Sequence, residues 1–287
     1  MKKLVVLMLV LVLGLTCVLS SGCGEKLVGF DIEMAEAVGE ILDIKIEFTE
    51  INWDLKVDLI NGNQIDVVWN GFTYTKDRDD GYYDEENQKQ IGGLDFTEFY
   101  MENRQVAVVK KSDVANYTSN ASFAGKRGVA EATSAGETVI IEVLGSTPAA
   151  AAAQLDIFTA VQAGTYDYGV LDATMASEYI VSENGGYHDS LAVVELEGVE
   201  KEYYAVAVKE DSNAKAVLNY AIAKLYESGK AQEIAKKYAC EGVLYNGFAD
   251  IDTANFTLPT DGEWARIKNK GTMVIGYTIF APMAYMA

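Results

Sequence analysis

Two charged side chains and several hydroxyl groups stand where the predicted strands end. Arg78 follows a Thr-Tyr-Thr segment that begins at Thr73, and its guanidinium can hold a carboxylate through two parallel hydrogen bonds. Asp172 ends the run Tyr-Gly-Val-Leu and offers the opposite charge, which suits an ammonium group. Thr133 and Ser134 stand at a predicted helix start, where free backbone N–H groups favour an anion. One cation and one anion with hydroxyl neighbours match an α-amino acid zwitterion.

These residues also have purely structural interpretations, which the sequence leaves open. Arg78 is flanked by aspartates on both sides, so a surface ion pair would explain it equally well. Asp172 is placed to cap the helix that follows it. Trp53 and Trp69 are of a residue type found more often in a core than on a binding surface.

The composition argues against several other classes of function. The chain has one histidine, His188, and Cys240 is the only cysteine beyond position 23, so neither a metal-ligand spacing nor a Cys/His pair is present. Acidic residues outnumber basic ones by 43 to 23, and only four residues are arginine, which disfavours binding to phosphate backbones. We therefore expect no cofactor, no metal and no nucleic-acid partner.

The first residues are typical of an export signal. A pair of lysines precedes an apolar run over 4–19, and small residues then lead to Cys23. The run is shorter than the roughly 20 residues that a membrane span needs. We predict a signal peptide over 1–22, and Cys23 resembles the lipidated cysteine of bacterial lipoproteins. Lipidation would anchor an exported protein at the outer face of the cell membrane. Plain secretion, into the periplasm or beyond, stays open because Ser20 stands where such signals usually have leucine.

Short apolar strands alternate with helices along the chain, a pattern that favours a mixed, mostly parallel sheet with helices on both faces. Asp31 is expected to cap the first of these helices. Two segments, 59–70 and 161–172, share one plan of helix end, glycine, short link, aspartate, apolar strand and polar residue. Such units are common in α/β proteins, so coincidence stays an alternative, but we predict two lobes of similar build. Ligands then bind beyond the carboxyl ends of the strands, in the cleft between the lobes.

The strands and turns described above closely resemble the polar amino acid-binding proteins of bacterial ABC transporters, family 3 of the solute-binding proteins. This resemblance implies a two-lobe fold of the type II periplasmic-binding-protein kind. It also implies that Arg78 and Thr73 hold the ligand carboxylate with help from Thr133 and Ser134, and that Asp172 takes the α-ammonium group. The segments that carry the resemblance are 26–32, 65–78, 95–100, 125–129 and 168–172.

The remaining contacts follow from the strand-end rule and from the resemblance together. Asn70 and Gly71 directly follow a predicted strand and are expected to face the ligand. Three aromatic residues, Trp53, Trp69 and Phe280, are expected to flank the ligand's side chain. The partner implied is an ABC transporter permease, to which the protein would deliver its amino acid.

The sequence does not identify the amino acid. Tyr277 stands where some family members carry an acidic residue against cationic side chains, which argues weakly against lysine or arginine. Closure by hinge motion is expected near 100–103 and 201–204. A lyase or dehydratase on the same scaffold would need a general base, and the candidates, among them Glu131, have no evident partner. A sensory domain would need a transmembrane link.

The order of the segments departs from the family. The usual opening helix, strand and aromatic-Ala-Pro loop stand at 263–287, which predicts a circular permutation with a new link over 241–262. A fragment of a tandem array or a gene-assembly artefact would explain the same order. The predicted limits are 24–103 for the first part of lobe 1, 104–202 for lobe 2 and 203–287 for the second part of lobe 1.

Overall fold

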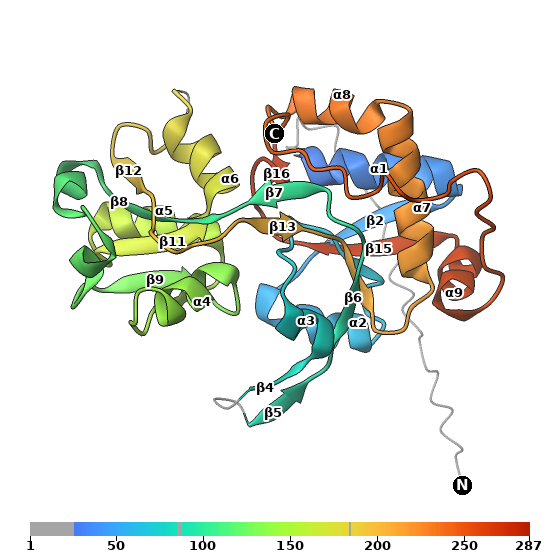
Figure 1. The fold of residues 1–287 in the computed structure, drawn as a ribbon, viewed down its shortest axis with the longest axis horizontal. Coiled ribbons are helices and arrows are strands. Elements are labelled where there is room, and N and C mark those ends of the chain that lie inside the picture. The colour runs from blue at the N-terminus through green and yellow to red at the C-terminus, as the bar shows by residue number, and fades with distance from the viewer. Residues whose placement is uncertain (1–25, 85–87, 184) are drawn as a thin grey trace, which may run out of the picture.

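The computed structural model describes residues 26–84, 88–183 and 185–287. The chain forms two lobes, each built on a five-stranded sheet with helices against it, and two long connections cross the waist between them (Figure 1). The predicted signal peptide and Cys23 lie outside the described residues. Within the described ranges, no helix is long and apolar enough to span a bilayer.

The sheet of lobe 1 has the strand order β2-β15-β3-β14-β6. β15 runs parallel to both of its neighbours, β2 and β3, whereas β14 runs antiparallel to β3 and β6. The interior position between β2 and β3 therefore belongs to a strand from the end of the sequence, with Ile275 fully buried. The strands are β2 (Lys45–Glu50), β3 (Val67–Val68), β6 (Leu94–Phe96), β14 (Ala207–Lys209) and β15 (Thr272–Tyr277).

The sheet of lobe 2 repeats this plan in the order β10-β9-β11-β8-β12. β9 is parallel to β10 and β11, and β8 is antiparallel to β11 and β12. Both sheets are mixed, as predicted, but parallel pairs make up half of the pairings rather than most. The strands are β8 (Gln105–Lys110), β9 (Gly128–Glu131), β10 (Ala149–Ala151), β11 (Tyr168–Asp172) and β12 (Leu191–Val194).

Helices pack against both sheets. In lobe 1, α1 packs against α7 and α8 through its apolar side. Lobe 1 contains α1 (Phe30–Leu42), α2 (Lys56–Asn61), α3 (Lys76–Asp80), α7 (Ala214–Glu227), α8 (Lys230–Lys237) and α9 (Gly262–Lys270). Lobe 2 contains α4 (Ala135–Glu142), α5 (Gln154–Ala163) and α6 (Ala173–Ala176). Shorter turns are η1 (Trp53–Leu55), η2 (Lys111–Asn116), η3 (Asn120–Phe123) and the π-helical η4 (Ser177–Val181).

Three short strand pairs complete the fold. β7 (Met101–Asn103) pairs antiparallel with β13 (Glu202–Tyr204) at the waist, where hinges are predicted. β4 (Tyr82–Asp84) and β5 (Lys89–Ile91) form a hairpin that projects from lobe 1. β1 (Leu27–Val28) pairs antiparallel with β16 (Tyr285–Met286).

Asp31 does not cap α1, contrary to the prediction. The helix begins one residue before it, with Gly29 as the N-cap at φ 144°. The Asp31 side chain is therefore free to turn inward, where one carboxylate oxygen accepts the Gly71 N–H at 2.6 Å and the Tyr100 hydroxyl at 2.9 Å. The start of α1 is thus tied to the loop that follows β3.

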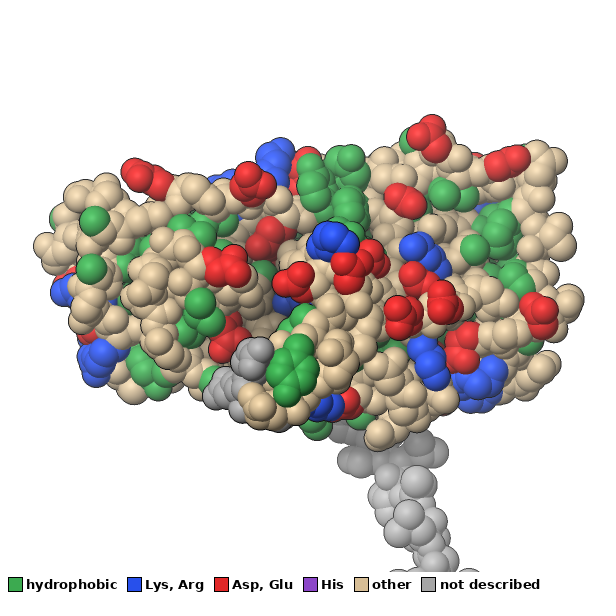
Figure 2. All heavy atoms as spheres, turned by 60° about the horizontal axis from the view of Figure 1, so that its bottom comes forward, with side chains coloured by type: hydrophobic (Ala, Val, Ile, Leu, Met, Phe, Trp, Pro, Cys, Tyr) green, Lys and Arg blue, Asp and Glu red, His purple; other side chains and the backbone are tan. Residues whose placement is uncertain are grey.

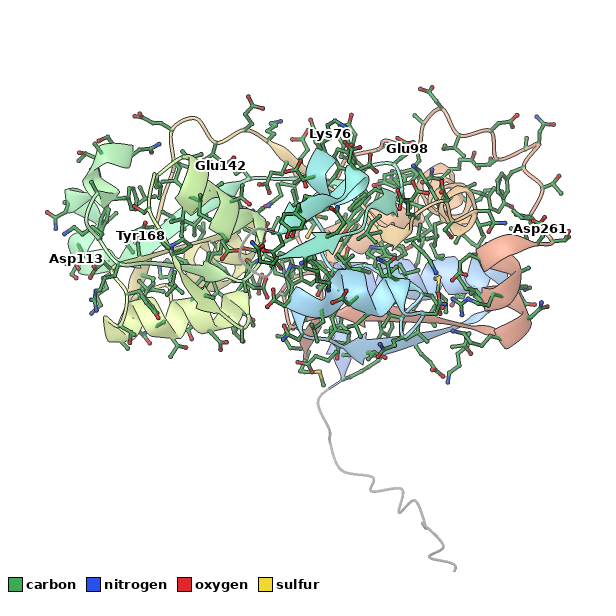
Figure 3. The ribbon with its side chains drawn as sticks, turned by 90° about the horizontal axis from the view of Figure 1, so that it is seen from below. Lys76, Glu98, Asp113, Glu142, Tyr168 and Asp261 are labelled. Carbon is green, nitrogen blue, oxygen red and sulfur yellow. The ribbon has the colours of Figure 1, made fainter. Side chains whose placement is uncertain are left out.

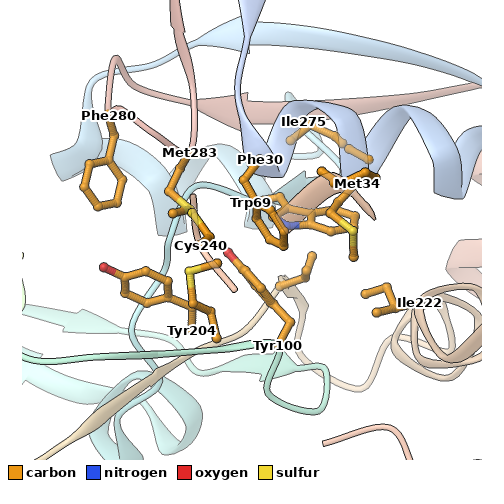
Figure 4. Close-up of a cluster of buried hydrophobic side chains, with 14 of the residues drawn as sticks. Phe30, Met34, Trp69, Tyr100, Tyr204, Ile222, Cys240, Ile275, Phe280 and Met283 are labelled. Carbon is orange, nitrogen blue, oxygen red and sulfur yellow. The ribbon is translucent and has the colours of Figure 1, made fainter. Parts of the chain in front are cut away.

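Aromatic and aliphatic side chains fill both lobes. In lobe 1, Phe30, Met34, Trp69 and Tyr100 pack together beneath α1 (Figure 4). In lobe 2, Tyr168 lies inside the lobe (Figure 3), where its ring packs edge-on against Phe123. Burial of each such side chain contributes about 1.5–3 kcal/mol. The largest cluster of buried side chains extends from Phe30 in lobe 1 to Ile157 in lobe 2, so the apolar interiors of the lobes are continuous.

Candidate functional site

A pocket lies between the two lobes, at the carboxyl ends of β3, β9, β11 and β15. The face seen in Figure 2 is hollowed between the lobes. Both lobes contribute side chains, as the strand-end rule predicts. The pocket is lined by Trp53, Asn70, Gly71, Phe72, Thr73, Arg78, Glu131, Ser134, Ala135, Gln154, Asp172, Thr278, Ile279 and Phe280.

Eight of the ten predicted ligand contacts stand in this lining: Trp53, Asn70, Gly71, Thr73, Arg78, Ser134, Asp172 and Phe280. Thr133 lies directly behind it and bonds to Arg78. Trp69 does not line the pocket, so its prediction as a flanking ring does not agree with the structure. It is 1% exposed and tilts against Tyr100 in the core of lobe 1, on the far side of Met283 from Phe280 (Figure 4). Alternation along a two-residue strand is too short to indicate on which face the indole lies.

Arg78 bridges the lobes. Its guanidinium donates to the Thr73 carbonyl at 2.7 Å and to the Thr133 carbonyl at 3.0 Å, and it stacks 4.9 Å from the centre of the Phe72 ring. α3 positions it, because the Thr75 hydroxyl accepts the Arg78 N–H at the helix start. Among the described residues it forms no ion pair with the neighbouring aspartates, so the surface interpretation does not hold.

Asp172 is buried among hydrogen-bond donors. One of its oxygens accepts from Gln105 at 2.9 Å, from the Tyr204 hydroxyl at 2.8 Å and from Asn103, and the other accepts from Gln154. Its side chain makes no capping bond to α6, so that alternative is not observed. Burial raises the carboxyl pKa, against the effect of these donors. The chain therefore holds a carboxyl group at the second-lobe wall of the pocket.

Glu202, on β13, is a second, partly buried acid that sequence reasoning missed. One of its oxygens accepts from Thr73 at 3.1 Å, from Asn103 at 3.2 Å and from Gln105 at 2.9 Å. Burial, and then the charge of Asp172, raise its pKa. The alternation of apolar and polar residues did not indicate that Glu202 turns inward, because a glutamate next to a lysine is typical of an exposed segment.

Lys56 was also missed. It is 4% exposed, and its ammonium group donates to the Trp53 carbonyl at 3.1 Å and to the Thr133 hydroxyl at 2.7 Å. The ammonium also lies 4.9 Å from the centre of the Trp53 ring. Burial is the main cause that lowers its pKa to about 7. The apolar residues Leu55, Leu59 and Ile60 predict a helix over 53–60 that buries Leu55, but Leu55 is 47% exposed because the segment begins as a 3-10 turn.

Gly71 has both a conformational and a steric reason to be glycine. Its φ is +55°, in the left-handed region, and a Cβ atom there would lie 2.3 Å from Cε1 of Phe280. The Phe280 ring can therefore rest directly on the backbone of the loop after β3. This close approach forms one apolar wall of the pocket.

The start of α4 binds a carboxylate of the chain itself. The Thr133 N–H donates to a Glu137 oxygen at 2.7 Å, and the Ser134 hydroxyl accepts the Glu137 N–H at 3.2 Å. Thr133 is in the left-handed region at φ 56°. The Thr133 N–H is thus already paired with a carboxylate of the chain, whereas Ser134 and Ala135 reach the pocket.

Comparison with known proteins decides the family. Residues 20–241 match the bacterial extracellular solute-binding proteins, family 3. The chain belongs to this family. A family 3 protein is a binding protein, which agrees with the expectation that this chain is not an enzyme. Among the described residues no group of three metal-ligating side chains is found.

Relatives and solved structures agree with this assignment. A probable histidine-binding protein of Neisseria gonorrhoeae is 28% identical over 219 residues, covering 75% of this chain and 76% of its own. The L-cystine-binding protein TcyA of Bacillus subtilis is 25% identical over 219 residues, covering 76% and 75%. A structure of an ABC uptake transporter substrate-binding protein from Streptococcus pneumoniae with bound histidine is 28% identical, with a TM-score of 0.64, covering 76% and 85%. The predicted type II periplasmic-binding-protein fold is confirmed.

Proposed function

We propose that this chain is the extracytoplasmic substrate-binding component of an ABC transporter, and that it binds a polar amino acid between its lobes. Arg78 and Thr73 would hold the carboxylate with Thr133 and Ser134, and Asp172 would hold the α-ammonium group. The ligand is then delivered to the transporter's permease. The named relatives bind histidine or cystine, which are both polar amino acids.

The observation that carries this proposal is a pair of opposite charges on facing walls of one pocket. Arg78 comes from lobe 1 and Asp172 from lobe 2, and both line the space between them. A free amino acid has the complementary pair of charges on one carbon, so it can satisfy both walls at once. Hydrogen bonds to charged groups contribute about 1.5–3 kcal/mol each, which gives micromolar or tighter binding when several form together.

Thermal unfolding of the full chain with each of the twenty amino acids tests this proposal. A ligand at a hundred times its Kd stabilises the folded state by about 2.7 kcal/mol, which raises Tm by several degrees for a chain of this size. Recovery of the unchanged ligand by mass spectrometry would separate binding from turnover. If none of the twenty raises Tm, the proposal is wrong.

Two substitutions test the residues. Arg78→Ala and Asp172→Asn should each weaken binding at least about a hundredfold, because each removes charged hydrogen bonds to the ligand. Arg104→Ala is the matched control, since Arg104 pairs with Glu195 on the surface, where its side chain is 53% exposed. Equal affinity in the Arg78 variant and the Arg104 control would reject the site.

We also propose that the two lobes comprise 24–103 with 203–287, and 104–202, and that they close by rotation about β7 and β13. Support comes from the pairing of Met101–Asn103 with Glu202–Tyr204 at the waist. Lys56 and Arg78, from lobe 1, both donate hydrogen bonds to Thr133 in lobe 2. These bonds would hold the lobes together alongside the contacts that a bound ligand makes to both lobes.

The order of segments in lobe 1 is proposed to be a circular permutation. In lobe 2 the chain runs β9, α4, β10, α5, β11. In the sheet of lobe 1 the equivalent positions belong to β15, β2 and β3, with α1 and α2 as the connecting helices. The counterpart of β9 is therefore β15, a strand from the C-terminal end of the sequence. The step from β15 to α1 is bridged by the pairing of β1 with β16, where the Lys26 N–H donates to the Ala287 carbonyl at 2.7 Å.

A rearranged chain tests this order. It begins at Gly262, runs to Ala287, continues through a short turn into Lys26 and ends at Asp261. We expect it to fold with the same ligand affinity, because all sheet neighbours are kept. Size-exclusion chromatography of the original chain should give a monomer; a dimer that exchanges its last strand, or a rearranged chain that does not fold, would contradict the proposal.

Attachment to the membrane through lipid on Cys23 is the last part of the proposal. Support comes only from the apolar run and the small residues before this cysteine. Expression in a bacterial host should place the protein in the membrane fraction with an acylated N-terminal cysteine, detected by mass spectrometry. Cys23→Ala should release it, whereas the control Cys240→Ser should not.

A further inference from the structure

Glu131 is the charged group of the pocket that the zwitterion contacts leave unused. It ends β9, is 4% exposed and stands in the pocket lining. Its Oε1 atom is buried and has no hydrogen-bond partner among the described residues. Burying a carboxylate oxygen without a hydrogen bond costs free energy. A ligand group that donates a hydrogen bond to Oε1 of Glu131 would remove this cost, which favours binding.

The other charged groups of the pocket already have partners within the chain. Arg78 donates to two carbonyls, and Lys56 donates to the Trp53 carbonyl and the Thr133 hydroxyl. Glu202 accepts three hydrogen bonds through one oxygen. Lys56 is not within ion-pair distance of Glu131 in the part of the chain that the structure describes, although its charge favours the ionised form of this acid. A ligand cation would therefore not have to break an existing ion pair.

The electrostatic setting also favours a positively charged partner. Burial is the largest cause that raises the pKa of Glu131 to about 8, and the neighbouring charge of Asp172 raises it further. A cation beside the carboxylate offsets both causes, because it stabilises the ionised form. A second carboxylate, such as an acidic ligand side chain, would add to the repulsion.

We propose that Glu131 binds the positively charged end of the ligand's side chain, so that the preferred ligand is an amino acid with a cationic side chain. The inference rests on the proposed function, since it needs the backbone of the amino acid to be held by Arg78 and Asp172. It also changes the expectation drawn from Tyr277. That residue packs edge-on against Phe48 with its ring centre 6.3 Å away and is not part of the pocket lining, so an acid from the other lobe takes the place of the one it lacks.

Isothermal titration of the full chain with L-lysine, L-arginine, L-histidine, L-glutamine and L-glutamate tests the inference. The original chain should bind lysine or arginine at least tenfold more tightly than glutamine, the fold-change that one charged hydrogen bond supplies. Glu131→Gln should lose most of this preference while keeping its affinity for glutamine within a few fold. The control Glu142→Gln, on the exposed side of α4 (Figure 3), should leave every affinity unchanged.

The outcomes separate this inference from the proposed function. Tighter binding of glutamine or glutamate than of lysine and arginine by the original chain overturns the role of Glu131 but leaves an amino acid-binding protein. An equal loss for all five ligands in Glu131→Gln assigns the carboxylate to the shared part of the amino acid and also overturns it. Binding of none by the original chain rejects both. The preference of the original chain decides the matter even where Glu131→Gln does not fold.

Discussion

Replacing Asp31 by asparagine should change how the stability of the protein depends on pH. The Asp31 carboxyl lies 1% exposed beneath the pocket loop, and burial is the main cause that raises its pKa to about 7 from an ordinary value of 3.8. The hydrogen bonds from Gly71 and Tyr100 act in the opposite direction but are outweighed. Asparagine keeps an oxygen for both donors and cannot ionise.

The sign follows from proton binding. Between pH 3.8 and about 7 the folded state keeps the Asp31 proton and the unfolded state does not, so the free energy of unfolding falls as pH rises through this window. A difference of about three pKa units at 1.36 kcal/mol each gives a loss of about 4 kcal/mol from pH 4 to pH 8. The stabilisation is complete below the unfolded value and is gone above the folded one.

Urea denaturation at pH 4, 6 and 8 measures this effect in the original chain and in Asp31→Asn. The original chain should lose about 4 kcal/mol more than the variant over this range. Glu131 titrates in an overlapping window, but it is present in both proteins and cancels in the difference. Asp250→Asn, on the surface, is the control and should follow the original chain. Parallel pH profiles for Asp31→Asn and the original chain would refute the reasoning.

Three further predictions concern packing. Gly71→Ala should cost about 2–4 kcal/mol of stability and weaken ligand binding, because a Cβ atom meets Phe280 and φ is left-handed; unchanged denaturation and titration curves would contradict this. Ile275→Ala should cost about 2–5 kcal/mol in urea denaturation, whereas Ile141→Ala, 53% exposed, should cost under about 1 kcal/mol; similar costs would argue against burial of β15 between β2 and β3. Cys240 should resist iodoacetamide at pH 8 until the protein is unfolded, as followed by peptide mass spectrometry, since burial raises its pKa to about 12; rapid labelling of the folded protein would exclude this.

The elements were predictable where hydrophobic periodicity was long and bounded by glycine. The sequence pattern predicts helices over 213–227 and 230–238 and a strand over 272–277, and α7, α8 and β15 agree with these limits to within one residue. The two related segments at 59–70 and 161–172 do end in β3 and β11, which occupy equivalent positions in the two sheets. Local pattern was enough in these cases because the tertiary structure agrees with it.

The pocket-lining residues could be predicted from the sequence mainly where they directly follow a predicted strand. Asp172 ends a predicted strand, so the strand-end rule pointed to it, whereas Arg78 was singled out by its charge after the Thr-Tyr-Thr segment; both side chains line the pocket. Lys56 and Glu202 were not found, because their burial depends on contacts 77 and 129 residues away along the chain, with Thr133 and Thr73. The position of Trp69 was predicted wrongly for a related reason. The packing of α1 determines which face of β3 is turned toward the cleft, and the local sequence pattern contains no information about that packing.

The position of β15 between β2 and β3 has a consequence for the order in which the two lobes fold during synthesis. A ribosome completes β2, β3, β6 and β14 before it reaches residue 272, so during synthesis the sheet of lobe 1 still lacks the strand that joins β2 to β3. Lobe 2, whose strands are all made by residue 194, can close much earlier. The nascent chain can therefore complete the sheet of lobe 2 while the sheet of lobe 1 is still divided, and lobe 1 folds last because β15 is made last.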